Sequence, residues 1–125
     1  MAYTELTAIK DLENIADEAI ATVSVSADYI DLHSIEVLNK VQWDMARIAV
    51  KCNALAHVAN DFICVSSFAK GASLEATRVF ESLRAVDHKS EVSAYTAVKW
   101  AKHTVKQYFG NLKKTIVAIW EQCDD

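Results

Sequence analysis

The pattern of apolar and polar positions along the chain predicts a series of helices. Between Thr4 and Val23, apolar residues recur at spacings of three and four, which places them on one helical face. The run Ser24-Val25-Ser26 then has weak helix propensity, so we expect a break there. The next helix has three candidate capping residues, because a side-chain oxygen can accept a hydrogen bond from an orphan backbone N–H. These candidates are Asp28, Asp31 and Ser34.

The strongest pattern is a heptad repeat between Ser34 and Ala69. Two series of positions repeat every seven residues: Leu38, Met45, Cys52, Ala59 and Ser66, and Val41, Ile48, Leu55, Phe62 and Ala69. A repeat sustained over this length predicts one helix of about 54 Å. Its residues become smaller towards the end, which favours close approach of a neighbouring helix. Gly71 is suited to end this helix in a left-handed conformation.

Two more helices follow in the pattern. A short one is predicted from Ser73, as its cap, to about Ala85, with Leu74, Val79, Phe80 and Leu83 as apolar positions. After a polar turn, the last helix runs from about Ser90 to Gln122, and Val98, Val105, Leu112 and Ile119 repeat at seven. Gly110 lies inside that helix, where glycine costs about 1 kcal/mol relative to alanine.

Composition narrows the fold class. The 125 residues include no proline and two glycines, and 52% of them are hydrophobic. A β-sandwich or barrel needs frequent turns rich in these two residues, and a Gly-rich phosphate loop needs clustered glycines. We therefore predict one all-α domain over residues 1–125, folded as an elongated antiparallel four-helix bundle with two long helices.

Charge is distributed unevenly along the chain. The net charge of −4 argues against a general nucleic-acid-binding protein. Residues 1–36 hold eight acidic residues and one base, whereas residues 89–114 hold six lysines and one acid. The favoured interpretation is that two oppositely charged helices lie side by side. The alternative is a basic surface that meets an anionic partner, either a lipid surface or a nucleic acid.

Cysteine usage and the hydrophobic pattern bear on the compartment. Three widely spaced cysteines favour reduced thiols, and we expect a cytoplasmic location. The first residues lack the basic and apolar regions of a leader peptide. No long uncharged apolar stretch occurs, so no transmembrane segment is expected.

Candidate chemistry is sparse. His57, Asp61 and Cys64 are spaced to share one side of the long helix, and these residue types bind metals. Neither a CxxC nor an HxxxH spacing supports them, so we favour a partly exposed polar row. We expect no metal and no cofactor, and no arrangement of Ser, His and Asp indicates a catalytic site. The protein is expected not to be an enzyme.

Two short segments resemble known helical families. Ser67, Lys70 and Gly71 resemble part of the histidine phosphotransfer domains, but serine replaces the phosphorylated histidine, which implies that the phosphotransfer chemistry is missing. Ser73-Leu74-Glu75-Ala76, before a long final helix, resembles the phasins. Phasins are helical coat proteins of polyester storage granules, so this resemblance implies adsorption to such a surface. Each resemblance covers only a few residues, and no family is assigned.

Two rows of side chains are the candidate partner-binding residues. A second apolar row follows the long helix: Trp43, Val50, His57, Val58 and Val65. The last helix carries a basic row with tryptophans: Lys99, Trp100, Lys102, Lys106, Lys113 and Trp120. The first row either packs inside the bundle or joins another chain. The second is either a solvated face beside the acidic helix or an anionic-surface site.

The leading functional expectation is a non-catalytic protein–protein interaction module, such as an adaptor, inhibitor or regulatory subunit, that self-associates. The alternative is an amphipathic helical protein that adsorbs to an anionic lipid or granule surface.

Overall fold

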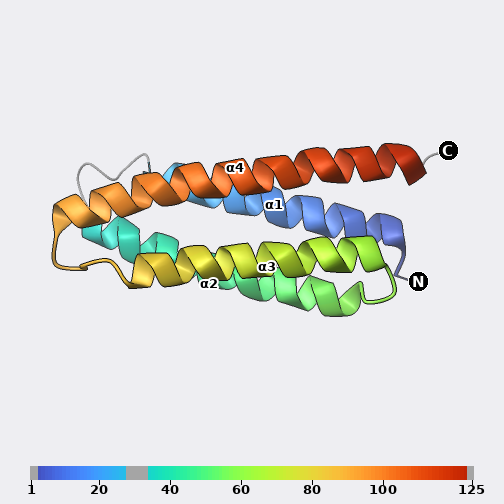
Figure 1. Ribbon diagram of the computed structural model, residues 1–125, viewed down its shortest axis with the longest axis horizontal. Coiled ribbons are helices and arrows are strands. Elements are labelled where there is room, and N and C mark those ends of the chain that lie inside the picture. Colours follow the sequence, from blue (N-terminus) through green and yellow to red (C-terminus); the bar gives the residue numbers. More distant parts are fainter. Residues whose placement is uncertain (1–2, 28–33, 124–125) are drawn as a thin grey trace.

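The computed structural model shows four helices that run alternately in opposite directions along one long axis (Figure 1). It describes residues 3–27 and 34–123, with side chains for residues 3–24 and 34–118. The helices are α1 (Glu5–Ala27), α2 (Ser34–Val58), α3 (Ile63–Arg84) and α4 (Glu91–Cys123). The prediction of an elongated antiparallel four-helix bundle is confirmed.

All four helices contribute to one continuous core. Its largest fully buried side chains include Leu12, Leu38, Met45, Ile48, Leu83 and Phe109. The apolar face predicted for the first helix is buried, except for Leu6, which is exposed, and Ile20, which is half-buried. The two heptad series are also buried, except for the half-buried Phe62. Hydrophobic periodicity therefore identified the core residues of the first half of the chain.

The prediction of one helix from Ser34 to Ala69 is wrong. The chain reverses at residues 59–62, where the backbone N–H of Phe62 donates to the carbonyl of Ala59 at 2.8 Å. Asn60 and Asp61 lie in this turn, and their short polar side chains favour turns over helix interiors. The heptad pattern continues through the reversal because both helices turn their repeated positions towards the same core.

Other local predictions also differ from the structure. Gly71 and Ser73 lie inside α3, so Gly71 is not a helix end and Ser73 is not a cap. The phasin-like tetrapeptide that starts at Ser73 is likewise internal to a helix. Ser24-Val25-Ser26 is not a break, because α1 continues to Ala27. Of the candidate caps, Ser34 begins α2, whereas Asp28 and Asp31 lie outside the described residues.

Small residues allow α2 and α3 to pack more closely than any other pair of helices. The Ser66 hydroxyl donates to the carbonyl of Ala56 at 2.9 Å, and the Ser73 hydroxyl donates to the carbonyl of Ala49 at 3.0 Å. Donors and acceptors are both seven residues apart, so the two bonds repeat along the interface. Ala56 lies in the last turn of α2, where carbonyls lack intrahelical partners. Ser66 therefore caps the end of α2 from the neighbouring helix.

The packing of α3 against α4 is looser and depends on Gly71. A Cβ atom at Gly71 would lie 3.2 Å from the hydroxyl oxygen of Tyr108, which belongs to α4. Glycine thus leaves space for the tyrosine at this crossing. Gly110 differs, because a Cβ atom there would meet nothing within 4 Å.

Replacement of Ser66 by alanine should lower the free energy of unfolding by about 1–2 kcal/mol, because a buried carbonyl of α2 loses its donor. Urea unfolding measures this loss. Ser67→Ala is the matched control, since Ser67 is exposed on the same helix. Equal effects of the two substitutions would contradict the capping role.

The two glycines should respond differently to alanine. Gly110→Ala should raise the free energy of unfolding by about 1 kcal/mol, because the substitution adds helix propensity without a clash. Gly71→Ala should gain less or lose stability, since Tyr108 must move. Thermal and urea unfolding compare the two variants, and an equal gain at Gly71 would show that Tyr108 yields without cost.

Candidate interaction surfaces

An apolar surface surrounds α3 on its outward side. Trp43 and Val50 of α2 are 66% and 69% exposed, and their spacing of seven places them on one side of that helix. The Trp43 ring lies 6.1 Å from the ring of Phe80, which belongs to α3. Leu74 of α3 is 72% exposed, although the sequence pattern suggested an apolar packing position. This side of the bundle thus offers large apolar groups to solvent.

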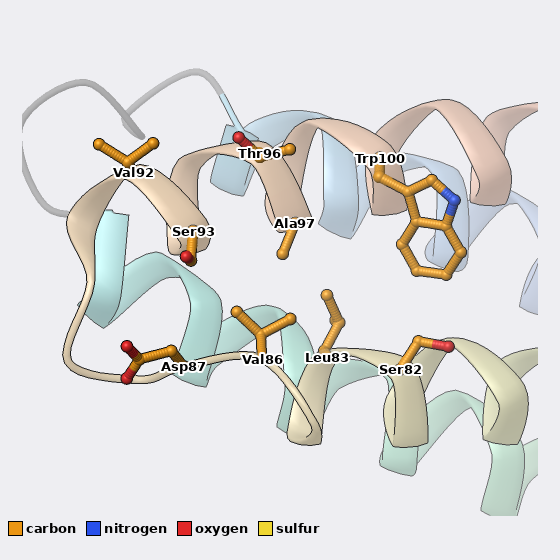
Figure 2. Close-up of a pocket in the computed structure, with 9 residues that line it drawn as sticks. All are labelled: Ser82, Leu83, Val86, Asp87, Val92, Ser93, Thr96, Ala97 and Trp100. Atoms are coloured by element: carbon orange, nitrogen blue, oxygen red, sulfur yellow. The ribbon is translucent and has the colours of Figure 1, made fainter.

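The same surface includes a groove between the end of α3 and the start of α4 (Figure 2). Its volume is about 530 Å³. Leu83 and Val86 face Ala97 across it, and Trp100 lies over its other end near Ser82 (Figure 2). Val92, at its edge, is 77% exposed. The groove therefore has apolar walls from two helices and is open to solvent.

We call the surface formed by Trp43, Val50, Leu74, Val92 and Trp100 the α3 face. These five are half of the ten large hydrophobic side chains that are exposed among the described residues. Sequence analysis found Trp43, Val50 and Trp100 but missed the groove, Leu74 and Val92. The spacing of eight between Val92 and Trp100, just over two helical turns, was an available signal that the two lie within about 80° of each other around the last helix.

The predicted apolar row does not form one surface. Val65 belongs to α3 and is buried in the core, so it is not a candidate for partner binding. Val58 is exposed but lies beside α1, in a shallow hollow that Tyr3 and Ile15 also line. His57 is exposed near the end of α2. The reversal after Val58 separates Val65 from the rest of the row, which lies on α2.

The acidic α1 and the basic α4 lie side by side, in agreement with the charge pattern (Figure 1). Lys113 and Asp17 form an ion pair at 2.5 Å, and their hydrogen bond raises the pKa of Lys113. Another acid of α1 pairs elsewhere, because Glu18 contacts Lys51 of α2 at 2.7 Å and Arg47 at 3.5 Å. Ion pairs from the acids of α1 therefore link it to both α2 and α4.

The basic row of α4 also divides into two parts. Lys99, Lys102, His103, Lys106 and Gln107 line one shallow hollow. Trp100 lines the α3–α4 groove instead, with the guanidinium carbon of Arg78 5.8 Å from its ring centre. Trp100 is thus separated from the lysines, contrary to the expected mixed row. The side chain of Trp120 lies outside the described residues.

The metal-site alternative gains no support from the geometry. His57 lies in α2, Asp61 in the turn and Cys64 in α3, so they do not share one helix side. Over residues 3–27 and 34–123, the structure contains no group of three or more His, Cys, Asp or Glu side chains that could hold a metal ion.

The buried thiol of Cys52 is poorly suited to nucleophilic chemistry. Cys52 is fully buried, and burial raises its pKa from 9.0 to about 12. Since the thiolate is the reactive form, the thiol is almost wholly protonated and inert near neutral pH. Burial also raises the pKa of Tyr108, on which Glu75 and Cys52 act in the same direction.

The raised pKa of Cys52 predicts a loss of stability in alkali. Between pH 9 and pH 12 the unfolded chain releases this proton while the folded chain keeps it, so the free energy of unfolding should fall by up to about 1.4 kcal/mol per pH unit. Well below pH 9, where the unfolded thiol is also protonated, this group should contribute no slope. Tyr3, whose pKa is raised to about 12 by burial and by its bond to Asp11, and Tyr108, whose pKa burial also raises, add to the slope mainly above pH 10.

Urea unfolding at several pH values, with reductant present, measures the slope. Cys52→Ala should lower stability at every pH because it leaves a cavity, but it should flatten the curve between pH 9 and pH 10. An unchanged slope in this variant would contradict the assignment to Cys52.

Among the described residues, no helix is long and apolar enough to cross a membrane. Comparisons with protein-family models, with curated proteins and with solved structures give no match, so the surfaces themselves carry the functional argument.

Proposed function

We propose that the protein is a non-catalytic interaction module that self-associates through the α3 face. The observation that carries this proposal is the concentration of exposed apolar side chains around one helix. Large apolar groups that gather on one side of a bundle are typical of protein–protein interfaces. Tryptophan is also enriched among residues that dominate binding energy, and the α3 face presents Trp43 and Trp100 at its two edges.

The charges of α3 support a second copy as the partner. Lys70, Arg78 and Arg84 alternate along α3 with Glu75 and Glu81. If two copies of α3 pack antiparallel around a two-fold axis near residue 77, Glu75 of each copy faces Arg78 of the other. Within one chain these two side chains already form an ion pair. A two-fold interface must be self-complementary, and the pairing of Glu75 with Arg78 meets that requirement at the centre of the interface.

The dimensions of the face are compatible with a dimer. The 22 residues of α3 correspond to a length of about 33 Å. With its flanks on α2 and α4 the face is roughly 20 Å wide, since packed helices lie about 10 Å apart. The product, about 660 Å², is close to the ~800 Å² that each partner contributes to a standard interface.

The thiols support a cytoplasmic location as part of this proposal. Cys52 and Cys64 are both free, and Cys64 is exposed. An exposed free thiol persists in a reducing compartment, where glutathione and thioredoxin keep cysteines reduced.

Sedimentation equilibrium over a wide concentration range tests self-association. The native protein should form a dimer, and Leu74→Glu or Val50→Glu should weaken dimerisation about tenfold or more, because each places a charge in an apolar contact. Val117→Glu is the matched control: Val117 is 51% exposed but lies beside α1, away from the α3 face. Its dimerisation should equal that of the native protein.

A native protein that stays monomeric at all concentrations would overturn the proposal. So would a dimer that Val117→Glu weakens as much as Leu74→Glu. Circular dichroism of each variant establishes that the helical content is unchanged before the comparison is made.

A further inference from the structure

A second, chemically different surface lies on the first half of α4. Tyr95, Lys99, Lys102 and Lys106 follow one another at spacings of three and four, and His103 lies four residues after Lys99, which places all five along one side of the helix. Lys99, His103 and Lys106 are exposed, and Lys102 is half-buried. We call these five residues the lysine ridge. The ridge brings three lysines within two to three turns of one helix.

In the part of the chain that the structure describes, the ion pair between α1 and α4 lies in the second half of α4 and not at Lys99 or Lys106. Because α1 runs antiparallel to α4 and Asp17 pairs with Lys113, the part of α1 after Asp17 runs beside the part of α4 before Lys113 (Figure 1). Residues 19–27 of α1 include no charged residue. Among the described residues, Lys99 and Lys106 form no ion pair. Lys99 and Lys106 are therefore exposed cations that no described acid of α1 pairs with.

The ridge itself contains no acid that would weaken it. The sequence of α4 has no Asp or Glu between Glu91 and Glu121, while Lys113 meets both Asp17 and Glu13 of α1. The contrast along α4 is therefore between Lys113, which pairs with an acid of α1, and Lys99 and Lys106, which do not. The whole chain carries a net charge of −4, so the residues outside the three ridge lysines together carry −7.

The shape of the ridge favours a flat anionic surface over a soluble anion. All of the residues that line its hollow come from one helix, so no second element closes over a ligand. That helix forms a long outer edge of the elongated bundle (Figure 1). Tyr95 is 39% exposed, with the Lys99 ammonium 5.5 Å from its ring centre. An exposed aromatic ring beside a lysine ammonium suits the headgroup layer of a membrane.

We propose that the lysine ridge docks the protein peripherally on an anionic lipid bilayer. The phosphate and carboxylate groups of the lipid headgroups contact Lys99, His103 and Lys106, and the Tyr95 ring lies at the level of the headgroups. This contact is independent of the α3 face, because Trp100 and the groove lie on another side of α4. Dimerisation through the α3 face would add avidity but is not required.

Vesicle flotation with the full chain tests the docking. The protein should float with vesicles of phosphatidylcholine and phosphatidylserine and not with vesicles of phosphatidylcholine alone, and salt should weaken the binding. Lys99→Gln combined with Lys106→Gln should weaken binding about thirtyfold, since each lysine near an anionic surface contributes about 1 kcal/mol.

The control variant makes the same charge change elsewhere. Lys89 and Lys114 are exposed and belong to neither the ridge nor the α3 face, so Lys89→Gln with Lys114→Gln lowers the net charge equally while leaving both surfaces intact. Its binding should fall much less than that of the ridge variant. Tyr95→Ser should weaken binding to a degree that salt changes little, because the ring contributes an apolar contact.

Three outcomes would overturn the proposal: no binding to anionic vesicles at low salt, equal losses for the ridge variant and its charge-matched control, or stronger binding to soluble inositol hexakisphosphate or to single-stranded RNA than to vesicles. Because the readout is flotation, it is separate from sedimentation. A monomeric protein that floats refutes self-association alone, and a dimer that does not float refutes the docking alone.

Discussion

The close approach of α2 and α3 is the constraint on which the rest of the bundle depends. Ser66 and Ser73 donate to backbone carbonyls of α2, and alanines such as Ala56 and Ala69 keep the two backbones near each other. The pair forms a rigid hairpin because the turn at residues 59–62 is short and bonded at both ends. Helices α1 and α4 then cover the apolar sides that the hairpin leaves open.

This arrangement determines where the surfaces lie. Since α3 is held mainly by α2, its contact with α4 is looser, and the groove opens between Leu83 and Ala97. On the other side, α4 packs closely against α1. The Asp17–Lys113 ion pair marks the register of these two helices. One long helix thus borders an apolar groove on one side and carries a cationic ridge on another.

The two proposals use these sides for different physical reasons. Burial of exposed apolar groups drives association at the α3 face, and this contribution depends little on salt. Coulomb attraction drives docking at the lysine ridge, and ions in solution screen it. The two contributions are therefore separable by experiment, although both surfaces include residues of α4.

Much of the fold follows from the sequence alone. The absence of proline, the scarcity of glycine and the helical spacing of apolar residues indicated an all-α bundle, and the heptad positions from Leu38 to Ala69 identified core residues. Side-chain burial depends on which positions share a helical face, and that information is local. The start and end of the last helix were also predicted closely, because polar residues border its repeat.

Only the tertiary structure decided where the second helix ends and which residues are exposed. A repeat of seven looks the same whether the helix continues or folds back on itself, so the reversal at residues 59–62 was not visible in the pattern. That reversal buried Val65 and placed Gly71 opposite Tyr108. It also left Leu74 exposed. The sequence by itself determined the composition of each helical face, and the packing of the helices determined which faces remain open, because burial at a helix's edge depends on its neighbours.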